Sequence, residues 1–205
     1  MNTKEKTLEI VSGTLLVPKP ESGFKINNQR EPGIVSIILN VKGKTVRFVD
    51  LNKPTDFPLF HSFGFKLRFI DEIFAFCGSP GADFEKLDMQ NIFCTYCSLG
   101  EYLPFEPKGG GSFSKSLHWM PIGLYELKKF FTAFMEGDLN VPDFKFFYGS
   151  RILNLDQMDS FYLIPQDAFT DFKFEKIVLW DEQEETDLHP KLLRRTRPLS
   201  LAVCP

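Results

Sequence analysis

Apolar and polar residues alternate most clearly between residues 34 and 49. Residues 34–41 are β-branched and apolar, Lys42-Gly43 has the composition of a turn, and residues 45–49 return with the same period. Alternation with period two around a short turn predicts a β-hairpin. The face expected to be buried carries Val35, Ile37, Leu39 and Val41, with Val46 and Phe48 packing across from it.

Other segments carry either a two-residue or a helical period. Strands are predicted over residues 7–17, with a kink at Gly13, and over residues 144–148, 160–164 and 172–180. A short strand running into a helix is predicted over residues 63–77, and a helix over residues 83–97. A further helix is predicted over residues 121–136, because Pro121 suits a first turn and Gly137 a stop. Its apolar stripe is Leu124, Leu127, Phe131 and Phe134.

The order of these elements is β-rich, then helical, then β-rich again. Regular βαβ alternation is absent, so we expect an α+β fold with a mostly antiparallel sheet and two or three helices in the middle of the chain. We expect a single domain over residues 1–190 and a basic, proline-containing C-terminal tail over residues 191–205. Residues 100–116 form the longest irregular stretch.

Composition narrows the class of protein. With 205 residues and 43% hydrophobic content, the chain can form one well-filled core. It has no apolar run near the roughly 20 residues of a membrane helix, so we expect no membrane association and a cytoplasmic location with access to the nucleus. The formal net charge of −3 gives no general attraction to nucleic acid. We therefore expect a protein partner.

Cys94 and Cys97 form the one C-x-x-C pair, a spacing that can hold zinc or form a redox disulfide. A closed zinc site needs two further ligands, and the candidates Cys77, His118 and Cys204 do not form a second close pair. We therefore expect two half-buried cysteines, with no bound metal and no cofactor.

No motif predicts catalysis. The histidines His61, His118 and His189 lie near serines in sequence, but sequence proximity alone does not supply the geometry of a catalytic triad. The run from Lys108 through three glycines to Ser112 lacks the order of a phosphate-binding loop. Most of the carboxylates near the C-terminus lie in one acidic run, residues 181–187. We therefore expect a non-enzymatic protein without catalytic residues.

Two segments are candidates for binding. Long irregular segments tend to be binding loops, and residues 100–119 combine three glycines with large side chains. The expected interaction surface is Tyr102, Phe105, Phe113, His118 and Trp119, unless these side chains fold back onto the core. The basic tail, which could contact phosphates, direct nuclear import or simply be solvated, carries Lys191, Arg194, Arg195 and Arg197.

Two segments resemble the non-structural protein encoded on the small genome segment of phleboviruses. In that family an apolar strand is followed by an acidic residue and then by an apolar residue and a proline. Residues 46–51, followed by Phe57-Pro58, have the same order. Residues 117–123 are similar to its Trp-Pro-x-Gly segment, with Met120 inserted. The resemblance implies a virulence factor that disables host antiviral signalling or RNA silencing by binding host proteins. The aromatic-rich composition, with 23 Phe, agrees with such an origin.

Three functions are therefore considered. The first is a viral accessory protein that sequesters a host antiviral or silencing factor. The second is a toxin-immunity or phage anti-defence binding protein. The third is an enzyme with an unfamiliar site, which would bring titratable groups together in a concave pocket.

Overall fold

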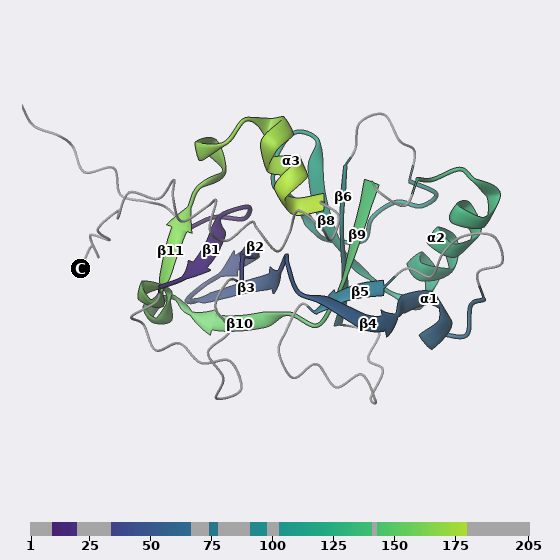
Figure 1. Ribbon diagram of the computed structural model, residues 1–205, viewed down its shortest axis with the longest axis horizontal. Helices are drawn as coiled ribbons and strands as arrows, with labels where there is room; N and C mark the ends of the chain where they lie inside the picture. The colour runs from purple at the N-terminus through teal and green to yellow at the C-terminus, as the bar shows by residue number, and fades with distance from the viewer. Residues whose placement is uncertain are drawn as a thin grey trace, which may run out of the picture.

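The computed structural model describes residues 10–19, 34–66, 74–77, 91–97, 103–140 and 143–179. Within them the chain forms two sheets, with helices between the sheets and against one end of the molecule (Figure 1). The expected α+β class is confirmed, since every strand pair is antiparallel except β5 with β9.

The first sheet has five strands in the order β10-β3-β2-β1-β11. The second has six strands in the order β4-β5-β9-β6-β8-β7. The strands of the first sheet are β1 (Leu15–Pro18), β2 (Ser36–Lys42), β3 (Thr45–Asp50), β10 (Arg151–Asn154) and β11 (Phe161–Ile164). Those of the second are β4 (Pro54–Pro58), β5 (Phe74–Cys77), β6 (Ile92–Cys97), β7 (Gly111–Ser112), β8 (Leu117–Ile122) and β9 (Phe144–Tyr148).

Three α-helices and two short 3-10 helices accompany these sheets in the described part of the chain. They are α1 (Leu59–Ser62), α2 (Leu124–Glu136), α3 (Asp171–Leu179), η4 (Leu155–Ser160) and η5 (Gln166–Ala168). In Figure 1, α3 lies between the two sheets, whereas α1 and α2 lie together at the far end of the second sheet. None of the described helices has the length and apolar character needed to cross a lipid bilayer.

Side chains that alternate along the strands fill three apolar clusters. The first cluster, called the shared cluster, is formed by both sheets and by α3. Helix α3 contributes Phe174, Ile177 and Val178 to it. A second, rich in phenylalanine, lies between the other face of the second sheet and helices α1 and α2. The third covers the remaining face of the first sheet. Because both sheets bury both faces, their strands show more continuous apolar runs than an alternating pattern would give.

The hairpin of β2 and β3 confirms the clearest prediction, and Gly43 takes a positive φ of 59° in its turn. A bulge lies between Ile38 and Asn40, where the register shifts. Val35, Ile37 and Leu39 face the shared cluster as expected, whereas Val41, beyond the bulge, pairs with Val46 and is 36% exposed. Val46 and Phe48 were expected to pack on the same face, but they lie in the third cluster, on the opposite face of the sheet.

Several element predictions are wrong. Residues 92–97 form strand β6 instead of a helix end, residues 74–77 form strand β5, and residues 171–179 form helix α3 instead of a strand. Helix α2 begins at Leu124, because residues 117–122, Pro121 among them, pair with β6 as strand β8. Strand β6 is buried on both faces, so periodicity cannot distinguish it from a buried helix.

The strands predicted over residues 144–148 and 160–164 are confirmed as β9 and β11. Of the strand predicted over residues 7–17, the described part is a strand over Leu15–Pro18 only, as β1. Gly13, in a turn before it, has the expected kink, with a φ of 88°. The basic tail, His189, Cys204, Tyr102 and the acidic run 181–187 lie outside the described residues.

Candidate functional site

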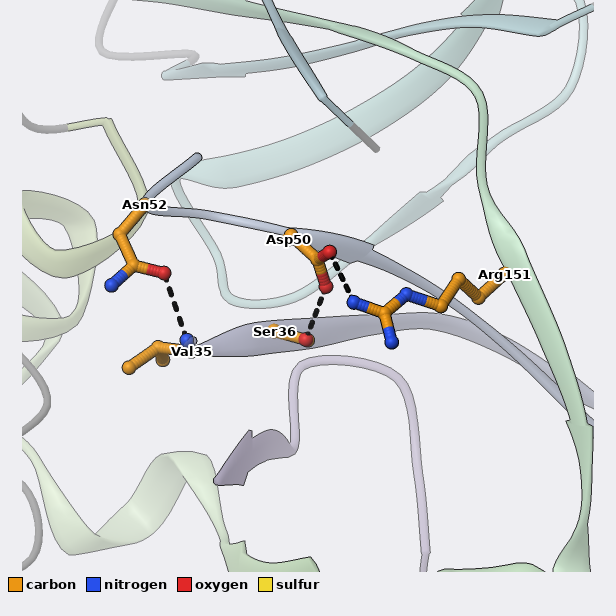
Figure 2. Close-up of polar contacts among 5 residues, drawn as sticks. All are labelled: Val35, Ser36, Asp50, Asn52 and Arg151. Atoms are coloured by element: carbon orange, nitrogen blue, oxygen red, sulfur yellow. Dashed lines mark hydrogen bonds and ion pairs between the residues drawn. The ribbon is translucent and has the colours of Figure 1, made fainter. Parts of the chain in front are cut away.

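A buried polar cluster lies where the chain passes between the sheets (Figure 2). The Arg151 guanidinium at the start of β10 forms an ion pair with the Asp50 carboxylate at the end of β3. The Ser36 hydroxyl on β2 donates a hydrogen bond of 2.6 Å to the other Asp50 oxygen. The three side chains share one face of the first sheet, where Ser36 is the direct cross-strand neighbour of Asp50.

Both crossings of the chain between the sheets begin or end at this ion pair. After Asp50 the chain leaves β3 for β4 in the second sheet, and at Arg151 it returns from β9. Asn52, on the first crossing, accepts a hydrogen bond of 2.8 Å from the backbone N–H of Val35 (Figure 2). The cluster therefore ties together two segments that are a hundred residues apart in sequence, which is a structural role.

Burial controls the electrostatics of this cluster. The Asp50 side chain is fully buried and that of Arg151 is 9% exposed. Removal from water raises the pKa of the Asp50 carboxyl, against the opposing effects of Arg151 and of the Ser36 hydrogen bond. The Arg151 guanidinium also lies over the Phe48 ring, 5.4 Å from its centre. Its Nε has no hydrogen-bond partner among the described residues.

The C-x-x-C pair lies within strand β6, not at the end of a helix. Side chains three residues apart on a strand point to opposite faces, and their Cα atoms are roughly 10 Å apart. Cys94 lies in the phenylalanine-rich cluster, and burial raises the pKa of its thiol well above the usual value. Both cysteines are buried, and neither forms a disulfide within the described residues. This geometry does not allow Cys94 and Cys97 to bind one metal ion or to form a disulfide with each other.

No group of three or more His, Cys, Asp and Glu side chains gathers as a metal site in the described ranges. Cys204 and the side chain of Cys77 are not part of those ranges. The expectation of no metal stays a prediction for the whole chain.

One serine and one histidine do meet. Ser112 Oγ on β7 is 2.8 Å from His118 Nδ1 on β8, and the His118 ring packs on Tyr96 at 5.4 Å between centroids. Activation of a serine requires such a neighbouring base. Here, however, Ser112 is exposed on the edge strand of the sheet, so water reaches the pair freely. We interpret the contact as a cross-strand hydrogen bond.

The glycine-rich segment 108–112, which we call the strap, lies along the edge of β8. Gly110 has a φ of 102°, and a Cβ at this position would overlap the carbonyl oxygen of Trp119. A Cβ on Gly111 would come within 2.9 Å of Trp119 Nε1. The glycines are therefore needed for close packing against β8, and they cover an edge that would otherwise be open to pairing.

The described side chains of the predicted interaction surface are largely turned inward. Phe113 and Trp119 belong to the shared core cluster, with 5% and 7% exposure. Phe105 is half-buried and packs edge-on against Phe130 at 5.1 Å. His118 is half-buried on β8, between β6 and the edge strand β7. A role of these residues in binding stays a prediction, but the aromatic rings themselves fill the core.

A different group of side chains is exposed at the start of α2. Leu124 and Tyr125 are 55% and 57% exposed, although Leu124 was expected in the buried stripe. Lys108 of the strap and Lys129 of α2 hold their Nζ atoms 5.8 and 5.9 Å from the centre of the Tyr125 ring. Together with the exposed Lys128, one turn beyond Leu124, these residues form what we call the α2 patch.

The sequence reasoning missed both groups. A signal for the cluster is a lone aspartate that ends an apolar strand, at Asp50, because a buried charge requires a partner. A signal for the patch is the pair Leu124-Tyr125 followed four residues later by Lys128-Lys129, which places all four on the outer half of the helix.

The arrangement of two sheets with α3 between them is similar to that of proteins whose structures have been solved. The protein DIP2367 from Corynebacterium diphtheriae matches 98% of this chain and 97% of its own, with a TM-score of 0.57 and 14% identity. The AlgH protein from Pseudomonas aeruginosa, a UPF0301 protein, matches 96% of this chain and 95% of its own, also with a TM-score of 0.57 and 14% identity. At this identity the likeness shows the fold alone. No protein-family model and no curated protein sequence matches the chain.

The resemblance to the phlebovirus non-structural protein is therefore wrong. The fold matches two bacterial proteins over nearly the whole chain. The segments that suggested the resemblance are strands β3 and β8, and their apolar and aromatic residues are explained by burial within the sheets. The expected viral accessory role, and with it the suppression of host antiviral or silencing factors, is withdrawn.

Proposed function

We propose that this protein is a non-catalytic binding protein that holds a protein partner on the α2 patch. The observation that supports the proposal is the pair of large apolar side chains, Leu124 and Tyr125, exposed side by side between lysines. Exposed apolar groups rimmed by polar ones mark interaction sites, and tyrosine is enriched among residues that dominate binding energy.

The reactive groups in the described ranges support a role without catalysis. The Asp50 carboxylate is engaged by Arg151 and Ser36, and the Cys94 thiol is buried with a raised pKa that disfavours the thiolate. The Ser112–His118 pair is exposed on an edge strand, where water weakens the electrostatic interactions that activate a catalytic serine. These groups contribute to the fold, and none of them lies in the α2 patch.

The patch also differs from the other exposed apolar side chains. The large hydrophobic residues with more than a third of their surface exposed, among the described residues, are Val11, Val41, Leu124, Tyr125 and Ile152. Leu124 and Tyr125 are the two that adjoin on one helix. A single exposed apolar residue needs no functional explanation, but a contiguous pair with fixed cations beside it supports a contact surface.

A protein partner fits this surface better than a nucleic acid, because the formal net charge is −3. We propose that binding takes place in the cytoplasm, with access to the nucleus. The choice between an immunity or anti-defence protein and another binding role depends on the partner's identity.

The test is affinity capture from the native host with the wild-type protein and with the double variant Leu124→Ala/Tyr125→Ala. Ile152→Thr is the matched control, because Ile152 is also 55% exposed but lies on β10 in the other sheet. We expect one partner to be recovered with the wild type and with Ile152→Thr, and lost with the double variant. Equal recovery with all three proteins would contradict the proposal.

Ser112→Ala and His118→Ala test the catalytic alternative. Hydrolysis of p-nitrophenyl acetate by the wild type that disappears in both single variants would show that the exposed pair is catalytic, and would overturn the non-catalytic assignment.

A further inference from the structure

The α2 patch has a fixed charge pattern in addition to its apolar pair. Lys108 and Lys129 reach Tyr125 from different segments, one from the strap and one from the next turn of the helix. An ammonium group over an aromatic face is held there by the ring quadrupole. Each lysine has three N–H donors, so an ammonium beside the ring can still donate to a ligand.

The strap gives Lys108 a defined position. Two residues further on, Gly110 packs against the backbone of Trp119 and Met120, and the Ser112 hydroxyl contacts His118. Lys108 therefore projects from a segment that is docked on β8 and not from a free loop. A docked cation loses less conformational entropy on binding than one on a free chain.

The outer face of the first two turns of α2 carries no exposed carboxylate. Its exposed residues are Leu124, Tyr125, Lys128 and Lys129. The acidic residue in these turns, Glu126, is half-buried and accepts a hydrogen bond of 3.0 Å from the backbone N–H of Gly123. The face therefore presents two apolar groups and two cations, and Lys108 adds a third cation beside them.

Resting on the proposed function, we infer that the α2 patch recognises an acidic segment of its protein partner that also carries apolar side chains. Carboxylates of the segment pair with Lys108, Lys128 and Lys129, and an apolar side chain packs on Leu124 and Tyr125. Charge complementarity selects the partner and orients it, while the apolar contact supplies most of the affinity.

A single-stranded nucleic acid is the other ligand that would use a tyrosine among lysines. Leu124 offers no stacking surface and no hydrogen bond to a base. The chain as a whole is acidic, with a formal net charge of −3, which opposes phosphate binding beyond the patch. These two features favour the acidic peptide.

The test uses defined probes with the full-length protein. Fluorescence anisotropy is measured with a labelled dodecapeptide of repeating Glu-Glu-Leu, a Lys-Lys-Leu peptide of the same length, and an oligodeoxythymidine of the same length. The variants are Lys108→Gln/Lys128→Gln/Lys129→Gln, Leu124→Ala/Tyr125→Ala, and the control Lys42→Gln/Lys44→Gln in the hairpin turn of the first sheet. Thermal unfolding checks that each variant is folded.

We expect the wild type and the hairpin control to bind the Glu-Glu-Leu peptide alone. The triple glutamine variant should lose about tenfold in affinity, as expected for three exposed charge pairs together, and raising the salt should reduce the difference. Binding of the Lys-Lys-Leu peptide or of the oligonucleotide with equal affinity would overturn the inference, and so would an undiminished affinity of the triple variant.

The two proposals fail in different ways. If the Glu-Glu-Leu peptide does not bind, while capture of the native partner still depends on Leu124 and Tyr125, the inference about acidic segments is wrong and the proposed function stands. If capture does not depend on these two residues, the proposed function itself is wrong.

Discussion

The Asp50–Arg151 cluster and the α2 patch both gather charged and apolar side chains from distant parts of the sequence, but with opposite exposure. In the cluster, a fully buried carboxylate meets a cation that is 9% exposed and a serine hydroxyl. In the patch, the lysines, Leu124 and Tyr125 lie in water. A buried charge must be paired within the fold, so the cluster joins β2, β3 and β10 within the first sheet and offers nothing to a ligand.

The comparison separates two kinds of residue that are unusual for their position. A charge that is buried is required for the stability of the fold, whereas a large apolar side chain that is exposed is not. No described contact of the fold requires Leu124 or Tyr125 to be large and apolar, since both project from the outer side of α2. Changes in the cluster should therefore alter stability, and changes in the patch should alter binding.

Substitutions on the inner and outer faces of α2 should differ most in their effect on the free energy of unfolding. Phe130 is fully buried among Phe134, Phe144 and Phe146, so Phe130→Ala should lower the free energy of unfolding by about 3–5 kcal/mol. Leu124→Ala/Tyr125→Ala, on the outer face, should change it by less than about 0.5 kcal/mol. Urea denaturation measures both. A double variant as unstable as Phe130→Ala would show that the patch is part of the core.

Breaking the buried ion pair should have the next largest effect. Arg151→Met leaves the Asp50 carboxylate buried without its counter-charge, at a cost of about 3 kcal/mol. Adding Asp50→Asn removes the unpaired charge, so the double variant should recover part of the lost stability. The comparison uses urea denaturation of the two single variants and the double variant. Strictly additive losses would show that the two side chains do not interact.

A glycine of the strap should tolerate substitution by alanine only where the added Cβ does not meet β8. Gly110→Ala combines a φ of 102° with an overlap on the Trp119 carbonyl, and should cost about 1–3 kcal/mol. Gly109→Ala is the matched control, since its φ is also positive, at 90°, but its nearest neighbour would be 3.9 Å away. Thermal unfolding and Trp fluorescence compare the two. Equal losses would show that the close contact with β8 contributes nothing.

The pH dependence of stability tests the cluster most finely. Burial raises the Asp50 pKa above its ordinary value of 3.8, so the folded protein binds this proton more tightly than the unfolded chain. The contribution of Asp50 is therefore fully present below pH 3.8 and is lost as the pH rises through the folded pKa. The stability of the wild type relative to Asp50→Asn should accordingly be greatest below pH 3.8 and fall as the pH rises above that value. A difference that grows with pH would show that Arg151 outweighs burial.

Sequence patterns predicted the parts of the fold that depend on local periodicity. The β2–β3 hairpin, β9 and β11 lie as predicted, because alternation and turn residues specify them. Helix α3 was mistaken for a strand, since Phe172 and Phe174 alternate with polar residues. Its buried residues Phe174, Ile177 and Val178 follow helical spacing. Strand β6 was mistaken for a helix because neighbours on both sides bury all of its side chains.

The candidate site was harder to predict than the fold. Phe113 and Trp119 were expected at a surface, but their burial depends on a close approach of the strap to β8 that only the three-dimensional arrangement reveals. Leu124 was placed in the apolar stripe of α2, whereas the buried arc is centred nearer Phe130 and leaves Leu124 at its border. A sequence period gives the width of a buried face but not the orientation of the helix on its neighbour.

Site-specific photo-crosslinking in the native host tests the central claim most directly. The photoreactive amino acid p-benzoylphenylalanine replaces Tyr125 in the α2 patch and, in a second protein, Ile152 on β10, which is similarly exposed. We expect irradiation to give one adduct of defined mass from position 125 and none from position 152. The same adduct from both positions, or an adduct from position 152 alone, would contradict the assignment of the α2 patch as the binding surface.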